Sequence, residues 1–288
     1  MIAFYSNWTK PFYNKNNEST PYKVPDYELL CSIVSSLKWR ENNGNTLMIC
    51  DKIAGDYYRS LGIDKVWNDI DDNLKVPKNI DSEIYWAAGK LYAMNKVNTP
   101  FIMMDTDFIV WHNIYNKVSG KDLVAAHTER FKSYDGIDKY LNFKNNKILN
   151  NNQDVKPFNT SLLYIANNNF KDYYLEQAFN MMKDLEIINY HKYKQMITIE
   201  QRLLAILAKE QNLKTDTFLS ENIIYKKKKP RSFHTRNFSH IWHAKKTYEK
   251  DDERRKKYCQ KIANIIINDY PNYVKTLSKI EDLKPYFN

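Results

Sequence analysis

Residues 100–110, PFIMMDTDFIV, place two aspartates between two apolar runs. The apolar residues before Asp105 predict a buried strand, and the residues after Asp107 are apolar as well. Two carboxylates between apolar flanks are costly unless something pairs with them. They are therefore either turn residues that close a strand or ligands of a metal ion. A second Asp-x-Asp triplet, Asp69-Ile70-Asp71, lies in a polar stretch, and we interpret it as a solvated loop.

The residues around this stretch alternate between strand and helix patterns. Strands are predicted at residues 2–6, 46–51, 101–104, 121–127 and 158–166. Helices are predicted at residues 27–39, 52–62, 82–98, 198–212 and 258–270, with Ser82 as a cap and Pro271 as a stop. This alternation predicts an α/β fold, in which ligands bind beyond the carboxyl ends of the strands.

The bulk composition points to a globular chain with an anionic partner. The formal charge is +10, and nucleotides, nucleic acids and anionic membranes all carry the complementary charge. The three cysteines are far apart, so we expect free thiols. With no signal-peptide pattern and no apolar segment long enough to span a bilayer, we expect a cytoplasmic protein. We expect one domain at residues 1–246 and a helical extension at residues 247–288.

Four segments carry a resemblance to a known group of enzymes. PFIMMDTDFIV, with the helix pattern YWAAGKLYAMNKV before it, resembles the Asp-x-Asp segment of glycosyltransferases with the GT-A fold. FNTSLLYI, IEQRLLAI and HIWHAKK then resemble the Phe-Asn-Ser-Gly, Asp-Gln-Asp and His-x-x-Gly-x-x-Lys segments of the glycogenin-like family 8, in the same order. Ser161, Glu200, Arg202 and His243 differ from the family pattern, which is typical of a more distant GT-A group.

The resemblance implies a fold and an activity. The fold is a mixed central sheet flanked by helices. The activity is metal-dependent transfer of a sugar, of hexosyltransferase type, from a nucleotide sugar to a glycan, a lipid-linked molecule or a protein, as in polysaccharide biosynthesis. We expect a UDP-sugar as the donor.

The resemblance also implies a metal centre. Mn²⁺ or Mg²⁺ would stabilise the diphosphate leaving group. The implied ligands are Asp105, Asp107 and either His240 or His243.

Contacts to the donor are implied around this centre. Either Lys245 or Lys246 would bind the diphosphate as a point charge; the alternative is a solvated lysine. The other expected donor-binding residues are Tyr5, Ser6, Asn7, Trp8, Asp51, Lys90, Asp105 and Thr106. An aromatic ring after the first strand can stack on a base.

Three residues are candidates for catalysis. Asn159 would hydrogen-bond the donor sugar or the acceptor. Glu200 and Gln201 would lie at the sugar-facing end of the next helix, although such a pair is also typical of plain capping. Family 8 enzymes retain the anomeric configuration, and Gln201 agrees with retention. An inverting enzyme needs a carboxylate base, for which Glu200 is a candidate, so both outcomes stay open.

Other functions use some of the same features. A sugar-phosphate nucleotidyltransferase would carry a glycine-rich loop after the first strand, and residues 5–17 contain no glycine. A nuclease or nucleic-acid-binding protein would use the positive charge, but we do not expect nucleic acid as the partner. A non-catalytic binding module would keep the aspartates as structural residues. The basic runs at 226–229 and 254–257 are typical of solvated surfaces. The alternative is peripheral contact with an anionic membrane, where a lipid-linked acceptor would lie.

Overall fold

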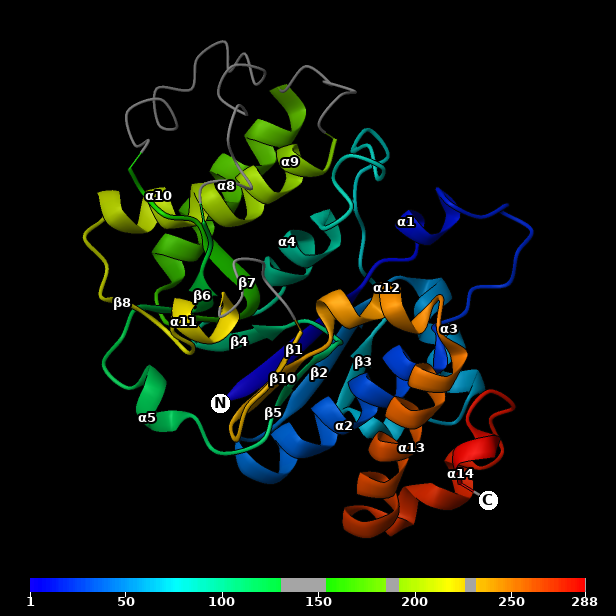
Figure 1. Ribbon diagram of the computed structural model, residues 1–288. Helices are drawn as coiled ribbons and strands as arrows, with labels where there is room; N and C mark the ends of the chain where they lie inside the picture. Colours follow the sequence, from blue (N-terminus) through cyan, green and yellow to red (C-terminus); the bar gives the residue numbers. More distant parts are fainter. Residues whose placement is uncertain (131–153, 185–191, 226–231, 288) are drawn as a thin grey trace.

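A computed structural model describes residues 1–130, 154–184, 192–225 and 232–287 (Figure 1). Its centre is a seven-stranded mixed sheet with the order β3-β2-β1-β4-β7-β6-β8. The strands are β1 (Ile2–Asn7), β2 (Thr46–Cys50), β3 (Asp69–Asp71), β4 (Phe101–Met104), β6 (Leu123–Thr128), β7 (Phe158–Ile165) and β8 (Thr215–Thr217). Only β7 runs against its neighbours, β4 and β6. The predicted α/β fold with a mixed sheet is confirmed.

A smaller antiparallel sheet crosses the carboxyl end of β4. It has the order β5-β10-β9. Its strands are β5 (Phe108–Val110), β9 (Phe233–His234) and β10 (Phe238–His240). Through β5, this sheet continues directly from the Asp-x-Asp segment.

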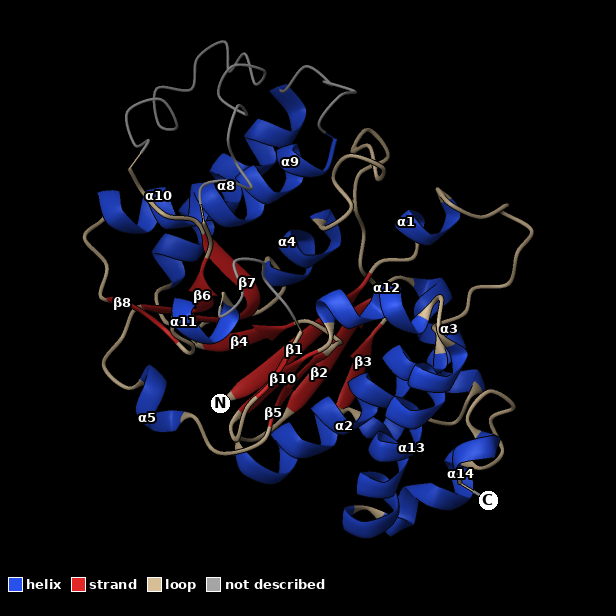
Figure 2. Ribbon diagram, in the orientation of Figure 1, coloured by secondary structure: helices blue, strands red, loops and turns tan. Residues whose placement is uncertain are grey.

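Helices cover both faces of the large sheet (Figure 2). The helices before β8 are α1 (Lys10–Tyr13), α2 (Asp26–Asn42), α3 (Lys52–Ser60), α4 (Ala88–Met94), α5 (Tyr115–Val118), α8 (Asn168–Asp184), α9 (Lys192–Ile197) and α10 (Leu203–Glu210). Those after β8 are α11 (Glu221–Ile224), α12 (Lys245–Tyr248), α13 (Asp252–Asp269) and α14 (Val274–Leu277). A π-helical turn, Thr198–Arg202, precedes α10.

The side chains of the central strands alternate between two apolar layers. Ala3 and Tyr5 of β1 belong to the layer that contains α2 and α13. Phe4 belongs to the opposite layer, with α4, α8 and α10. Since both faces of β1 and β4 are covered, these strands appear in the sequence as continuous apolar runs rather than as alternating ones.

Three predicted elements differ from the structure. The helix expected at residues 82–98 is regular only in α4, and the Ser82 hydroxyl donates to Asn14 Oδ1 (3.0 Å) instead of capping a helix. The triplet Asp69-Ile70-Asp71 is not a loop but an edge strand, because it pairs with β2. The helix expected at residues 198–212 begins with the π-helical turn.

The C-terminal helices pack onto the fold. The apolar side of α13 lies in the same core layer as α2. The boundary expected at residue 246 stays a prediction. Cys31, Cys50 and Cys259 are buried free thiols, as predicted. Among the described residues, none of the helices combines the length and the apolar character that crossing a membrane requires.

Candidate functional site

Asp105 and Asp107 lie in the turn that joins β4 to β5. The Asp105 amide donates to the Ser161 carbonyl of β7 (2.9 Å), and the Phe108 amide donates to the Asp105 carbonyl (3.1 Å). These bonds turn the chain at the carboxyl end of β4, which is the ligand-binding edge of an α/β sheet. The Asp107 side chain is buried, and that of Asp105 is partly exposed.

Strand pairing brings His240 to the same place. In the small sheet His240 pairs with Phe108, the residue after Asp107. Its Nε2 lies 3.4 Å from Asp107 Oδ1. One ligand atom each from Asp105, Asp107 and His240 lies within 4.8 Å of the others, so the three could hold a metal ion together.

Lys245 bridges Asp107 to a carboxylate of α2. Its ammonium lies 3.1 Å from Asp107 Oδ2 and 3.2 Å from Glu28 Oε2. Burial alone would raise the pKa of Asp107, but Lys245 and His240 hold that pKa well below its usual range. Burial raises the pKa of Glu28, and Lys245 offsets part of the rise. Asp107 therefore stays a carboxylate at neutral pH.

Lys90 makes the equivalent bridge on the other side. Its ammonium lies 2.6 Å from Asp105 Oδ1 and 3.0 Å from Glu200 Oε1. Burial would lower the pKa of Lys90, but Asp105 and Glu200 raise it above its usual value, so the lysine stays charged. The Thr160 hydroxyl also donates to Glu200 Oε1 (2.8 Å). Glu200 belongs to the π-helical turn, a distortion that is frequent at functional sites.

The charges of the cluster favour a divalent cation. The two bridges join four carboxylates to two ammonium groups, which leaves two negative charges. His240 Nδ1 and Glu200 Oε2 are buried without a hydrogen-bond partner. Carboxylate oxygens suit Mg²⁺ and Mn²⁺, whereas imidazole suits transition metals. The donor set thus fits a divalent metal without selecting one.

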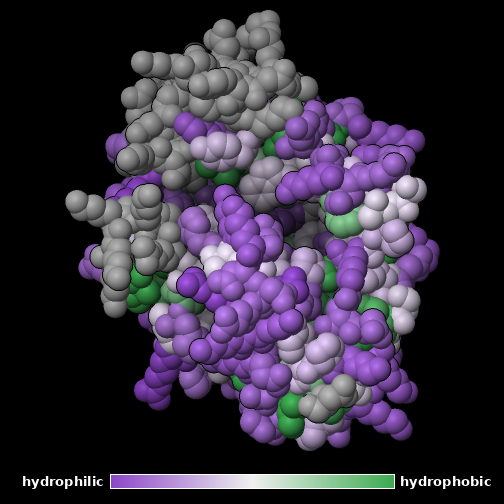
Figure 3. Space-filling model, turned by 45° about the vertical axis from the view of Figure 1, so that its right-hand side comes forward, coloured by the Kyte–Doolittle hydropathy of each residue, from purple (hydrophilic) through white to green (hydrophobic). Residues whose placement is uncertain are grey.

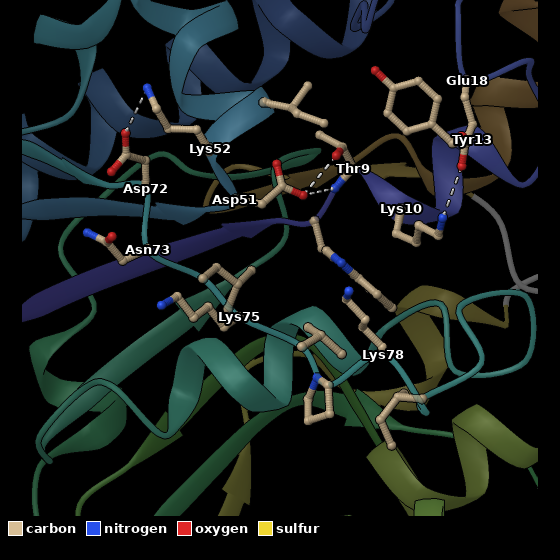
Figure 4. A pocket seen from close by; sticks show the side chains of 16 residues that line it. Thr9, Lys10, Tyr13, Glu18, Asp51, Lys52, Asp72, Asn73, Lys75 and Lys78 are labelled. Atoms are coloured by element: carbon tan, nitrogen blue, oxygen red, sulfur yellow. Dashed lines mark hydrogen bonds and ion pairs between the residues drawn. The ribbon is translucent and has the colours of Figure 1, made fainter.

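A pocket of about 880 Å³ opens beyond the ends of β1, β2 and β3 (Figure 4). Trp8, Leu74 and Ile80 contribute apolar surface to it. Lysines also line it, and Lys78 reaches toward the wall formed by Lys10 and Asp51. The lining combines four lysines with the carboxylates of Glu18, Asp51 and Asp72. In the space-filling view the surface is largely hydrophilic and is hollowed near its centre (Figure 3).

Helix α4 lies between this pocket and the cluster around Asp105 and Asp107. A Cβ added at Gly89 would lie 2.5 Å from Trp8 Cβ, so the helix lies directly against the tryptophan. The next residue, Lys90, pairs with Asp105. The pocket and the cluster therefore lie on either side of the start of α4.

The predicted donor-binding residues are only partly at the pocket. Trp8 and Asp51 line it. Asp51 also accepts from the Thr9 amide (2.7 Å) and caps α3 by accepting from the Ala54 amide (3.1 Å). Tyr5 is fully buried, with its hydroxyl on Ser35 (2.9 Å), so stacking of its ring on a base does not fit this structure.

The other predicted donor-binding residues lie around the pocket and the cluster. Ser6, Asn7 and Thr106 are partly buried, and they are not among the residues that line the pocket. Asn7 donates to the Tyr22 hydroxyl (2.8 Å).

The two histidine and two lysine candidates lie partly beside Asp107 and partly at the surface. His240 and Lys245 contact Asp107, whereas His243 and Lys246 are exposed. In each predicted pair of alternatives, one residue therefore contacts Asp107 and the other lies at the surface.

The other two catalytic candidates, Asn159 and Gln201, are at least half-buried. Asn159 is buried and donates to Glu129 Oε1 (2.8 Å). Gln201 is half-buried in the π-helical turn.

Comparison with known protein families places this chain in one of them. The profile of a family described as "Family of unknown function (DUF6734)" matches residues 1–280. The chain belongs to this family. No curated protein matches this family member in sequence.

Several solved structures are similar to this member of the family. Mouse xyloside xylosyltransferase 1 is 9% identical, with a TM-score of 0.40, and the match covers 75% of this chain and 84% of that one. The PaToxG glycosyltransferase is 14% identical, with a TM-score of 0.42 and coverages of 73% and 68%. The galactosyltransferase LgtC, solved with donor and acceptor sugar analogues, is 10% identical, with a TM-score of 0.40 and coverages of 75% and 72%. At these scores the likenesses do not assign an activity.

Three residues of the site carry no local sequence pattern that would identify them. Glu28 lies in an ordinary helix start, and Thr160 lies inside an apolar strand. Glu129 follows β6, is buried, and accepts from Asn159 and from the Tyr225 hydroxyl. Only contacts between distant segments distinguish these residues.

Proposed function

We propose that the chain is a metal-dependent glycosyltransferase that uses a nucleotide-sugar donor. The observation that carries the proposal is the group of Asp105, Asp107 and His240 beside a pocket of nucleotide size. A diphosphate needs cationic partners, and a nucleoside needs a concave, partly apolar pocket. The two features are adjacent, as one elongated donor requires. The sequence resemblance to GT-A enzymes supports the same assignment.

Each part of the donor has a proposed partner. The nucleoside, which we propose to be uridine from the resemblance, would lie in the pocket lined by Trp8. Asp105, Asp107 and His240 would hold Mn²⁺ or Mg²⁺, which as a Lewis acid stabilises the charge of the leaving diphosphate. Lys245 would contribute a fixed positive charge to the same diphosphate.

The surroundings of Glu200 favour retention over inversion. A general base must be free to accept the proton of the acceptor hydroxyl. Glu200 Oε1 is engaged by Lys90 and Thr160, and although Oε2 has no hydrogen-bond partner, the side chain is only 1% exposed, which keeps it away from an acceptor hydroxyl. We therefore propose that Glu200 positions Lys90. Asn159 and Gln201 remain the proposed contacts to the sugar.

Loops usually build the acceptor pocket of such an enzyme, and we propose residues 130–154 for this role. Most of these residues, and the basic run at residues 226–229, lie outside the described residues. In the second basic run, Arg254 pairs with Asp251, and Arg255 and Lys256 pair with Asp252. Because these charges are partly neutralised, the attraction of this run to an anionic membrane is weakened. A cytoplasmic location and peripheral membrane contact stay proposals.

A donor-hydrolysis screen tests the proposal. The protein would be incubated with UDP- and GDP-sugars in Mn²⁺ or in EDTA, and release of the nucleoside diphosphate measured by chromatography. We expect Mn²⁺-dependent release from at least one donor and a loss of at least about 100-fold in Asp107→Ala, because a ligand of the charge-stabilising group is removed.

Asp71→Ala is the matched control. It removes the last carboxylate of the other triplet, which also pairs with a lysine, Lys96 (2.6 Å). We expect it to retain activity. Absence of release from every donor by the wild type would contradict the proposal, and salt-sensitive binding of oligonucleotides would favour the nucleic-acid alternative.

A further inference from the structure

Glu28 is a second carboxylate partner of Lys245, independent of the metal-ligand group. The Lys245 ammonium is about equally far from Glu28 Oε2 (3.2 Å) and Asp107 Oδ2 (3.1 Å). The two carboxylates come from different elements, the first turn of α2 and the turn between β4 and β5. Of the two, only Asp107 belongs to the group of three that could hold a metal.

Glu28 and Lys245 lie on elements that pack against each other. Lys245 is the first residue of α12. The rings of Tyr27 and Tyr248 meet edge to face with centroids 5.4 Å apart, which fixes the start of α2 beside α12. Both charged side chains are partly buried, so solvent screens their attraction less than it would at the surface. The position of the ammonium is therefore set by the fold as well as by Asp107.

Electrostatic repulsion from a bound cation explains why Lys245 needs this second partner. A divalent cation on Asp107 and the Lys245 ammonium would share one carboxylate, and like charges a few ångströms apart repel by several kcal/mol at an effective dielectric of about 20. With Asp107 alone as partner, Lys245 would be displaced. Glu28 provides a second attractive partner 3.2 Å from the ammonium.

We propose that Glu28 is a positioning residue that retains Lys245 at the site while Asp107 binds a divalent cation, so that the ammonium meets the donor diphosphate. The inference rests on the proposed function and deepens its diphosphate site. Glu28 itself does not contact the donor. Its effect on binding passes entirely through Lys245.

Calorimetric titration with UDP in Mn²⁺ tests this role. Glu28→Gln keeps the shape of the side chain and a hydrogen-bond acceptor, but it removes the negative charge that opposes displacement of Lys245. We expect UDP to bind about 5- to 10-fold more weakly to Glu28→Gln, which corresponds to about 1 to 1.4 kcal/mol. Lys245→Met should weaken UDP binding by at least as much. The double variant should bind UDP no more weakly than Lys245→Met, because Glu28 has no other route to the diphosphate.

Glu249→Gln is the matched control for charge. Glu249 is exposed and close enough to Glu28 to influence its pKa, and none of the described ion pairs joins it to Lys245. We expect it to leave UDP affinity within about 2-fold of the wild type, in line with a weak, screened surface charge.

A separate titration with Mn²⁺ alone, followed by electron paramagnetic resonance, reports on competition for Asp107. Lys245→Met should bind Mn²⁺ at least as tightly as the wild type, since a competing cation is removed. Glu28→Gln should bind it more weakly, since Lys245 then depends on Asp107 alone.

The outcomes separate the two claims. If the wild type binds UDP with Mn²⁺ but Glu28→Gln behaves like Glu249→Gln, the positioning role is wrong and the proposed function stands. The same conclusion follows if Glu28→Gln weakens UDP binding equally in the Lys245→Met background. A wild type without Mn²⁺-dependent UDP binding overturns both.

Discussion

Asp107 and Asp71 occupy the same position in two Asp-x-Asp triplets and have different surroundings. Asp107 is 5% exposed and contacts His240 and Lys245. Asp71 lies on an edge strand and pairs with Lys96 at the surface. Both carboxylates form an ion pair with a lysine, so an ion pair alone does not identify a functional site. The added imidazole and the burial distinguish Asp107.

Asp71 allows a prediction about pH. Although burial would raise its pKa, Lys96 and the Asn73 amide lower it. A lowered folded-state pKa stabilises the protein above the unfolded value of about 3.9, and this stabilisation is lost as the pH falls below it. We expect the wild type to lose more unfolding free energy than Asp71→Asn between pH 5 and pH 3, by less than about 1 kcal/mol because the pair is partly exposed.

Urea denaturation at the two pH values would measure this difference. Equal losses in the two proteins would show that the Asp71–Lys96 pair does not form in solution. Mn²⁺ binding should be unaffected by the substitution.

Secondary structure was predictable where it is decided locally and not where it depends on pairing. Apolar runs located β1, β4 and β7, because both faces of these strands are buried. The polar sequence of the edge strand β3 is typical of a loop, and only its pairing with β2 makes it a strand. The π-helical turn was not predicted either, because its local sequence is that of an ordinary helix.

The packing of α4 on the end of β1 gives a prediction for Gly89. In an exposed helix, replacing glycine by alanine stabilises by up to about 1 kcal/mol. Here the new Cβ would lie 2.5 Å from Trp8 Cβ and 3.3 Å from its Cγ. Since overpacking costs about 1 to 3 kcal/mol, we expect Gly89→Ala to lower the melting temperature and, by shifting Trp8, to weaken UDP binding.

Thermal unfolding and calorimetry check the two effects of Gly89→Ala. A more stable variant with unchanged UDP affinity would show that α4 does not hold the wall of the pocket. A less stable variant with unchanged affinity would place the nucleoside elsewhere.

Across the whole molecule, the site combines segments far apart in the chain. The resemblance could nominate Asp105, Asp107 and His240, because their motifs occur in order. It left His243 open as an alternative to His240, and Lys246 as an alternative to Lys245. Among the described residues, the pairing of β5 with β10 brings His240 rather than His243 beside Asp107. Residues that act through tertiary contacts, such as Glu28, carry no local pattern to detect.

Stoichiometric Mn²⁺ binding tests the central claim most directly. Electron paramagnetic resonance would count bound Mn²⁺ in the presence of UDP for the wild type, Asp107→Asn and Asp71→Asn. We predict one ion per chain in the wild type and in Asp71→Asn, and affinity weakened at least about 10-fold in Asp107→Asn, which lacks one anionic ligand. A wild type that binds no Mn²⁺, or an Asp107→Asn variant that binds it as tightly as Asp71→Asn, would contradict the account.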